Sequence, residues 1–525
     1  QTRPKLTPML GALCLCLSAA AAADEADVVV VGTGPGAAGF LYRLLQLQPH
    51  LTVLWLERGP LDTAVTNWPE DIAFSGEERM LDRHAYSSRT YITPFSWRGF
   101  GGGDTMNAGA PNTLGLGTLP YFPVDVWSLR NVSYVPPTVD SERWRESLVA
   151  SGWTHDAGYP ARFSHSGETV GRPSTVFTAD GKSRRVLAQS VAAMAGVRVV
   201  RASVRRVLFE DGRAVGVEDW GGAVWFARRG VVLAGGVFGS FELLVESGIG
   251  PAKALEARGV APRVTNEAVG RGVGGEMPLV VKHINVARRR EEKVEPSLAA
   301  HSSKYKASLC WWSDGILTWW SQRNGWLDWL RFGPKAFRRL AFVAVSLPSA
   351  PAMHLEASKD GLILNDDEVE FTQEMCDGFA ALAPSLEAGF EAERLAGQAL
   401  EGWERVEYSV MRALLWLLTP VLRHLHSPLL TMPNPLTNFN LKPHCTKNEL
   451  ADYYHYYGGN GEQVVDAHYA VRGVAGLFIS DASVIRYLEP GPPTASVMQE
   501  GMRVADAFLG MLRGGELPSV AARRS

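Results

Sequence analysis

Apolar residues near the N-terminus follow a strand–turn–helix–strand order. Residues 27–31 read Asp-Val-Val-Val-Val, and such a run of β-branched residues predicts a strand buried on both faces. The glycine-rich stretch 32–37 follows at once, and the apolar spacing over residues 40–45 then predicts a helix. A second apolar strand is expected over residues 51–56, ending at Glu57.

The glycine-rich turn, Gly32-Thr33-Gly34-Pro35-Gly36-Ala37, has the residues of a nucleotide site. Gly32 permits the tight turn, Gly34 lets the backbone approach a pyrophosphate, and Ala37 is small enough where helix meets strand. The helix that begins near Pro35 and Gly36 offers free N–H groups to phosphates. Glu57 follows Gly32 by 25 positions, and its carboxylate suits hydrogen bonds to ribose hydroxyls. This turn predicts a dinucleotide site but leaves NAD and FAD equally open.

A later tract, residues 311–345, is rich in tryptophan and arginine. Trp312, Trp319 and Trp326 recur every seven residues, which predicts that they share one face of a helix. Tryptophan beside arginine suits a helix lying in a membrane interface, so the tract is a candidate for peripheral membrane contact. An aromatic helix packed inside a substrate domain is the alternative.

Two other segments bear on targeting and membranes. Residues 1–23 combine a short basic start with an apolar run ending in alanines, which resembles a signal peptide. The expected location is the secretory pathway or the extracellular space, with a plastid or other organelle as the alternative. Residues 409–429 read as a buried or surface-lying helix that Pro420 is expected to break.

Composition narrows the function classes. The chain has 525 residues, enough for about two to four structural units. Its 52 Lys+Arg against 55 Asp+Glu give a net charge of −3. This near-balance argues against nucleic acid as a partner, because phosphate neutralisation needs a strong basic excess. The five cysteines do not form a disulfide framework, and no metal site is predicted.

Four further stretches, read with the first turn, resemble the glucose–methanol–choline (GMC) family of FAD-dependent oxidoreductases. Residues 97–109, Trp-Arg-Gly-Phe-Gly-Gly-Gly-Asp-Thr-Met-Asn-Ala-Gly, look like its second glycine motif. Residues 199–218 and 230–251 look like its strand pair and its segment ending in Ser-Gly-Ile-Gly-Pro. Residues 455–482 are similar to its C-terminal signature, and their His-Tyr-x-Gly-Gly start is closest to the plant mandelonitrile-lyase-like branch.

The resemblance implies FAD as the cofactor and assigns residues to it. The second glycine motif is expected to run along the flavin, Val204 to hold the adenine by its backbone, and Asp481 to lie beside the pyrophosphate or ribityl chain. The expected FAD-binding residues are Gly32, Gly34, Pro35, Gly36, Ala37, Glu57, Gly102, Gly103, Asn107, Ala108, Val204, Asp481, Ala482, Pro493 and Thr494.

By the same resemblance His455 is the catalytic base. A neutral imidazole suits this role, because it can take the hydroxyl proton of an alcohol while a hydride leaves the carbon. A packing histidine among tyrosines is the alternative. The family carries a second His or Asn where this sequence has Pro492, and neither Pro492 nor Pro493 has an N–H to donate. Thr494 supplies an N–H or a hydroxyl instead.

These residues leave several functions open. The leading prediction is an FAD-dependent oxidoreductase acting on CH–OH groups of a fairly apolar, lipid-like or aromatic alcohol. Pro492 weakens that prediction, so three alternatives stay open. They are a hydroxynitrile lyase-like enzyme, an enzyme like the fatty acid photodecarboxylase with Cys445 as a candidate residue, and a catalytically inactive flavoprotein.

The expected fold is α/β and α+β. A Rossmann-like FAD-binding domain is expected from the separated segments 24–115, 190–275 and 452–525, after a signal-like or transit-like segment over 1–23. A substrate-binding domain with an antiparallel sheet is expected over 116–189 and 276–451.

Overall fold

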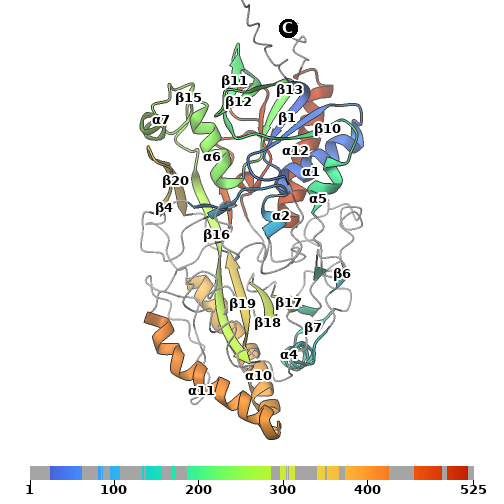
Figure 1. Cartoon of the computed structure of the whole chain (residues 1–525), viewed down its shortest axis with the longest axis vertical. Coiled ribbons are helices and arrows are strands. Elements are labelled where there is room, and N and C mark those ends of the chain that lie inside the picture. Colours follow the sequence, from blue (N-terminus) through green and yellow to red (C-terminus); the bar gives the residue numbers. More distant parts are fainter. Residues whose placement is uncertain are drawn as a thin grey trace, which may run out of the picture.

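The computed structural model places the chain in two large sheets with helices packed on both (Figure 1). The predicted segment 1–23 and the residues Asn107, Ala108, Cys445 and Pro492 lie outside the part that the structure describes. The described residues are 24–61, 81–83, 85–86, 95–106, 133–134, 137–156, 167–171, 174–175, 186–284, 296–302, 304, 307–313, 340–348, 352–365, 373–424, 454–487 and 493–517.

The seven-stranded sheet contains the predicted nucleotide-binding unit. Parallel strands lie in the order β10-β2-β1-β13, β23 pairs with the end of β13, and the antiparallel strands β12 and β11 continue from its start. Segments far apart in sequence therefore meet in one Rossmann-like sheet, as predicted. The bounds are β1 (Asp24–Val31), β2 (Val53–Glu57), β10 (Val197–Arg201), β11 (Val204–Glu210), β12 (Arg213–Asp219), β13 (Val224–Leu233) and β23 (Leu477–Ile479).

Apolar side chains on both faces of these strands bury the sheet between helices. Val28 of β1 packs in a core with helices α1 (Pro35–Leu47), α5 (Leu187–Ala192) and α12 (Thr494–Arg513). Its neighbour Val29 belongs to a second core with α6 (Gly236–Glu246), because successive strand side chains point to opposite faces. Both valines are fully buried, so the predicted two-sided burial is confirmed.

The ten-stranded sheet is mainly antiparallel, as expected for the substrate-binding part. Its order is β4-β21-β20-β16-β19-β18-β17-β8-β7, with β22 beside β16. In Figure 1 the long strand β16 runs from the level of the first sheet toward the opposite end of the molecule. The bounds are β4 (Ala85–Tyr86), β7 (Thr154–His155), β8 (Glu168–Gly171), β16 (Arg271–Ile284), β17 (Pro296–Ser302), β18 (Ala307–Ser313), β19 (Leu340–Pro348), β20 (Met353–Ala357), β21 (Leu362–Asn365) and β22 (Tyr454–Gly459).

The domain boundaries stay a prediction, and two strands show where they are least clear. β16 crosses the expected boundary at residue 275, and β22, expected in the FAD-binding domain, pairs with β16 in the second sheet. The remaining elements are short: β3 (Leu81–Arg83), β5 (Phe95–Trp97), α2 (Gly103–Met106), β6 (Ser133–Tyr134), β9 (Ser174–Thr175), β14 (Ile249–Gly250), α7 (Ala252–Arg258), β15 (Val264–Thr265) and η3 (Ala482–Val484).

The helix expected over the tryptophan-rich tract is wrong at its start. Trp311 and Trp312 lie in strand β18, which pairs on both sides with β17 and β19. Trp311 is buried, with its ring 5.5 Å from that of Trp144 on α4 (Val139–Ala150), and α10 (Gln373–Gln398) adds Phe390 to the same cluster. Sheet pairing and this aromatic core outweigh the seven-residue spacing, whose later members lie outside the described residues.

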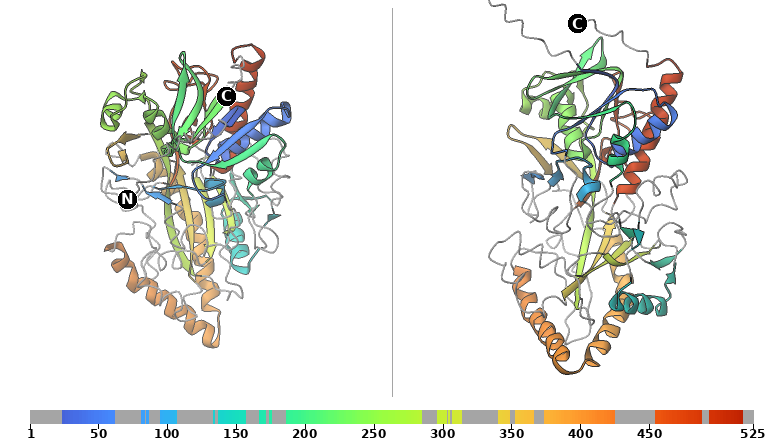
Figure 2. Two further views of the ribbon diagram at one scale, coloured as in Figure 1. Left: turned by 45° about the horizontal axis from the view of Figure 1, so that its top comes forward. Right: turned by 45° about the vertical axis from the view of Figure 1, so that its right-hand side comes forward.

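Helix α11 (Gly402–His424) also differs from expectation. It continues through Pro420 to His424, so the predicted break at Pro420 is wrong. Figure 2 shows α10 and α11 at the end of the molecule away from the seven-stranded sheet. In the described part of the chain no helix has both the length and the apolarity to cross a membrane.

Candidate functional site

The first glycine turn is held tightly on one side and open on the other. Gly32 has a φ of +99°, and a Cβ there would lie 2.3 Å from the carbonyl oxygen of Ala234 at the end of β13. A Cβ on Gly36 would lie 2.2 Å from the carbonyl oxygen of Ser480, just after β23. A Cβ on Gly34 would meet no atom within 4 Å. The turn, including Pro35 in the first turn of α1 and the buried Ala37, thus presents Gly34 to open space.

The carboxylate of Glu57 lies buried beside this turn. Its Oε2 accepts hydrogen bonds from the Thr33 hydroxyl at 2.6 Å and the Thr33 N–H at 3.2 Å, and its Oε1 accepts from the Gly59 N–H at 2.9 Å. A carboxylate has about four acceptor positions, so one remains on Oε1 for a ligand hydroxyl. The sequence does not single out Thr33, because only the fold brings it against Glu57.

Val204 lies close along the backbone to Glu57. The Ala202 N–H donates to the Glu57 carbonyl at 2.8 Å, and Val204 begins β11 two residues later. The residues assigned to the ribose and to the adenine are therefore brought together at one end of the predicted cofactor path.

The second glycine stretch packs against the first. Gly102 has a φ of +53°, and a Cβ there would lie 2.8 Å from the Gly34 Cα, whereas Gly103 has open space beside it. The Gly101 N–H donates to the Thr33 hydroxyl at 3.0 Å. Two glycine stretches separated by about 70 residues thus share one backbone contact, and Gly34 and Gly103 both border open space. Asn107 and Ala108, predicted to continue this site, are not described.

Asp481 is buried between the start of α6 and the end of β23. Its Oδ2 accepts from the Ser240 hydroxyl at 2.5 Å and the Gly236 N–H at 2.9 Å, and its Oδ1 accepts from the Ser483 N–H at 2.8 Å. Burial raises the pKa of Asp481, although the hydrogen bonds from Ser240, Ser483 and Gly236 act in the opposite direction. Asp481 therefore ties the start of α6 to the end of β23, and Ala482 follows it as the first residue of η3.

The Asp481→Asn variant is expected to lose about 2–4 kcal/mol of unfolding free energy, measured by urea denaturation. The asparagine side chain has only one acceptor oxygen. Its NH₂ group must therefore face at least one of the buried donors to which Asp481 now accepts, and that donor loses its hydrogen bond. Asp466→Asn is the matched control, because Asp466 also accepts two backbone N–H bonds but is half-buried. Equal losses in the two variants would contradict the central role of Asp481.

His455 occupies a β-bulge. Gly274 of β16 pairs with Tyr457 and Glu276 pairs with Tyr454, so two residues of β22 oppose one residue of β16. His455 has a φ of +54°, a left-handed conformation that non-glycine residues adopt uncommonly. Bulges of this kind re-aim a side chain and are frequent beside active sites. His455 is half-buried.

The strand of His455 meets the other C-terminal residues through a small apolar cluster. Tyr457, Ile485 and Val497 pack together with Ala482 against them. Pro493 caps helix α12, and the buried Thr494 is its first residue, as expected. The structure therefore gathers β22, η3 and the start of α12, although Pro492 lies outside the described residues.

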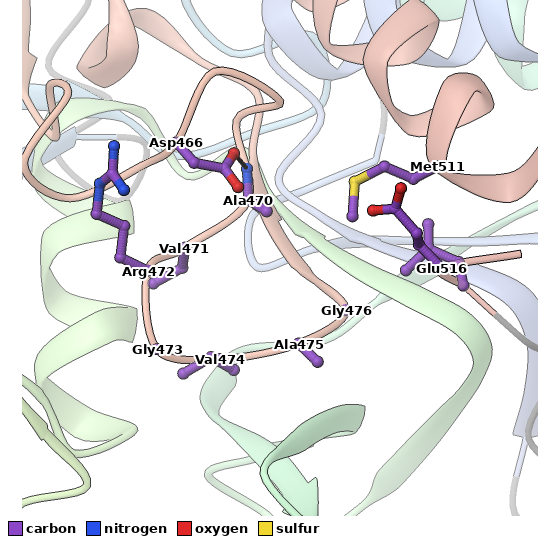
Figure 3. A pocket seen from close by; sticks show the side chains of 11 residues that line it. Asp466, Ala470, Val471, Arg472, Gly473, Val474, Ala475, Gly476, Met511 and Glu516 are labelled. Atoms are coloured by element: carbon purple, nitrogen blue, oxygen red, sulfur yellow. Dashed lines mark hydrogen bonds between the residues drawn. The ribbon is translucent and has the colours of Figure 1, made fainter. Parts of the chain in front are cut away.

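A hollow of 310 Å³ lies elsewhere, lined by the loop before β23 and the end of α12 (Figure 3). It includes Asp466, Arg472, Met511 and Glu516. The loop enters β23 at its amino end, whereas the glycine turns follow the carboxyl ends of β1 and β13, where open α/β sheets bind ligands. None of the predicted site residues lines it. Among the described residues no group of three or more His, Cys, Asp or Glu could hold a metal ion.

Comparisons with known proteins agree with this arrangement. A family model described as GMC oxidoreductase matches residues 169–277. The oxygen-dependent choline dehydrogenase of Yersinia pseudotuberculosis serotype IB is 29% identical over 211 residues, which is 38% of this chain and 33% of that protein. The homologue from Sinorhizobium fredii is 35% identical over 92 residues, 17% of each. The chain therefore matches about a third or less of the length of these curated relatives.

Solved structures match over nearly the whole chain. The formate oxidase of Aspergillus oryzae is 16% identical, with a TM-score of 0.59 over 94% of this chain and 99% of that one. Together these findings support the GMC oxidoreductase family. That formate oxidase carries FAD, and the prediction of FAD as the cofactor of this chain agrees with it.

The residues present fit a GMC flavin cofactor. A Cβ on Gly34, Gly103 or Gly236 would meet no atom within 4 Å, so the backbone at each of these glycines is open to close approach by a ligand. Asn460 Oδ1 and the side-chain amide of Gln499 are buried and, within the described residues, have no hydrogen-bond partner. Buried polar groups of this kind point to a ligand or water that completes them. Glu57 would hold the ribose, and the start of α1 the pyrophosphate.

Proposed function

We propose that this protein is an FAD-dependent oxidoreductase that oxidises a CH–OH group of a fairly apolar alcohol, with His455 as the base. The observation that carries the proposal is the bulge that holds His455 at positive φ beside the segments of Asp481 and Thr494. Backbone strain persists only where the surrounding structure imposes it, and it clusters at functional sites. The GMC family comparison and the relatives named choline dehydrogenase support an oxidoreductase.

Different residues of the chain would bind the cofactor and accept the substrate proton. Bound FAD would supply the hydride acceptor. The first glycine turn and Glu57 would bind and orient the nucleotide end, and a ring nitrogen of His455 would accept the hydroxyl proton of the substrate. Tyr456, whose ring packs at 5.1 Å against Phe238, helps to fix the strand that carries His455.

A second candidate keeps FAD without net oxidation, as in the hydroxynitrile lyase-like or photodecarboxylase-like alternatives or an inactive flavoprotein. Pro493 as the cap of α12 favours it, because the residue before the first helical turn has no N–H to donate. The sequence of residues 455–459, which resembles the mandelonitrile-lyase-like branch, also supports this second candidate.

Anaerobic spectroscopy of the purified protein separates these candidates. A flavin spectrum that bleaches on addition of alcohols from a panel of lipid-like and aromatic compounds supports the proposed oxidation. A flavin spectrum that stays oxidised with every alcohol excludes it and favours the lyase, photochemical or inactive alternatives. A protein that binds no flavin excludes all of them.

We also propose that the protein contacts a lipid surface. The tract 311–345 lies largely outside the described residues, but helix α11 exposes Trp403 by 73%, Val406 by 45% and Val410 by 44%, with the exposed cation Arg405 beside them. Trp403, Val406 and Val410 follow helical spacing, and an exposed apolar stripe of this kind suits a membrane interface. The exposed Glu401 and Glu404 lie beside Arg405, so burial of the apolar side chains rather than charge would carry the contact.

The protein is expected to co-sediment with phosphatidylcholine vesicles, and Trp403→Ser is expected to reduce the bound fraction at least threefold. Trp220→Ser is the matched control, since Trp220 is 58% exposed on the turn between β12 and β13. Equal binding by both variants would show that α11 does not make the membrane contact.

The secretory or organellar location stays a proposal, and sequencing the N-terminus of the mature protein tests it.

A further inference from the structure

Thr33 joins three segments of the predicted cofactor site through one buried hydroxyl. The hydroxyl donates to Glu57 Oε2 at 2.6 Å and accepts from the Gly101 N–H at 3.0 Å. Thr33 is 1% exposed and Glu57 is 5% exposed, so these bonds are shielded from bulk water. A threonine hydroxyl has one donor, which Glu57 takes, and the bond from Gly101 uses its acceptor side.

The second glycine stretch also packs closely against the residues that follow Glu57. A Cβ on Gly59 would lie 2.3 Å from the Arg98 carbonyl, and the Phe100 N–H donates to the Pro60 carbonyl at 3.0 Å. The segment 98–102 therefore rests on both the first glycine turn and the residues after Glu57. The Thr33 side chain connects these backbone contacts to the carboxylate of Glu57, the residue predicted to bind the ribose.

We infer that Thr33 is a positioning residue for FAD, which sets the Glu57 carboxylate and couples it to the second glycine stretch. The inference rests on the proposed FAD site. Both acceptor positions of Glu57 Oε2 face Thr33, so the orientation of the carboxylate depends on that residue, and Oε1 retains the free position for a ribose hydroxyl. Without the hydroxyl, the buried Gly101 N–H also loses its acceptor.

Titrations of the deflavinated full-length protein test this role. Thr33→Val keeps the shape of the side chain and removes the hydroxyl, and we expect the Kd for FAD to rise about ten- to a hundredfold, the range for losing a hydrogen bond to a charged group. The Kd for ADP is expected to rise equally, because ADP carries the same ribose and pyrophosphate. Thr33→Ser is expected to restore both to within about threefold of wild type.

Thr105→Val is the matched control. Thr105 is also a buried threonine of the second glycine stretch, but its hydroxyl donates to the Phe100 carbonyl and not to Glu57. We expect this variant to lose thermal stability without a comparable loss of ADP affinity. Should Thr33→Val fail to fold, Thr33→Ser against Thr33→Ala repeats the comparison with smaller side chains.

The results of these titrations distinguish failure of the Thr33 inference from failure of the proposed FAD-dependent function. Unchanged FAD and ADP affinities in Thr33→Val, or losses no larger than those of Thr105→Val, overturn the role of Thr33 and leave the FAD site standing. A wild-type protein that binds neither FAD nor ADP overturns the proposed function itself.

Discussion

The His455→Asn variant is expected to reduce flavin at a rate about 10²–10⁴-fold below wild type while keeping its full complement of FAD. The imidazole is the group that would take the substrate's hydroxyl proton, and asparagine cannot accept a proton at working pH. Asparagine is preferable to alanine, because residue 455 has a φ of +54° and asparagine tolerates that left-handed conformation. The measurement is the anaerobic rate of flavin bleaching after rapid mixing with the best alcohol.

The comparison needs a histidine that lies nearby in sequence but away from the site. His468 is exposed, and its backbone N–H donates to Asp466 in the loop that lines the hollow at the amino end of β23. His468→Asn is expected to bleach at the wild-type rate. A rate for His455→Asn within about threefold of wild type would show that another group, or no group, acts as the base.

Local patterns account for much of what the sequence predicts correctly. The valine run of β1, the glycine turn and the apolar period of α1 lie within about 20 residues, so their order alone specifies a βα unit. Glu57 is found at the end of β2, because strand length and spacing place it there. The meeting of the separated segments in one sheet followed from the family resemblance.

Contacts between distant segments explain most of what the sequence does not reveal. The hydroxyls of Thr33 and Ser240 donate to Glu57 and Asp481, and no periodicity marks a residue whose partner lies elsewhere in the chain. The bulge at His455 is equally invisible, because it depends on the register of β22 against β16. Trp312 shows the converse, since its helix-like spacing is overruled by strand pairing, with the neighbouring Trp311 in an aromatic core.

The Gly36→Ala variant is expected to lose about 4 kcal/mol or more of unfolding free energy, among the largest effects of a single methyl group. A Cβ on Gly36 would lie 2.2 Å from the Ser480 carbonyl and 2.9 Å from the Asp481 Cα, and the Gly36 carbonyl itself lies against Gly501 of α12. All of these neighbours are backbone, so no side chain can move aside. Helix α1 would have to shift away from β23, and urea denaturation measures the loss.

Gly34→Ala, two residues earlier, separates this packing role from a cofactor role. Gly34 has a φ of −67° and nothing within 4 Å of the Cβ position, so the added methyl group should leave the stability of the flavin-free protein unchanged or slightly raised. Because the open space beside Gly34 is where the pyrophosphate would lie, the FAD affinity is expected to fall at least a hundredfold. A Gly34→Ala protein that binds FAD as tightly as wild type would place the pyrophosphate elsewhere, whereas loss of FAD without loss of stability ties this glycine to the cofactor.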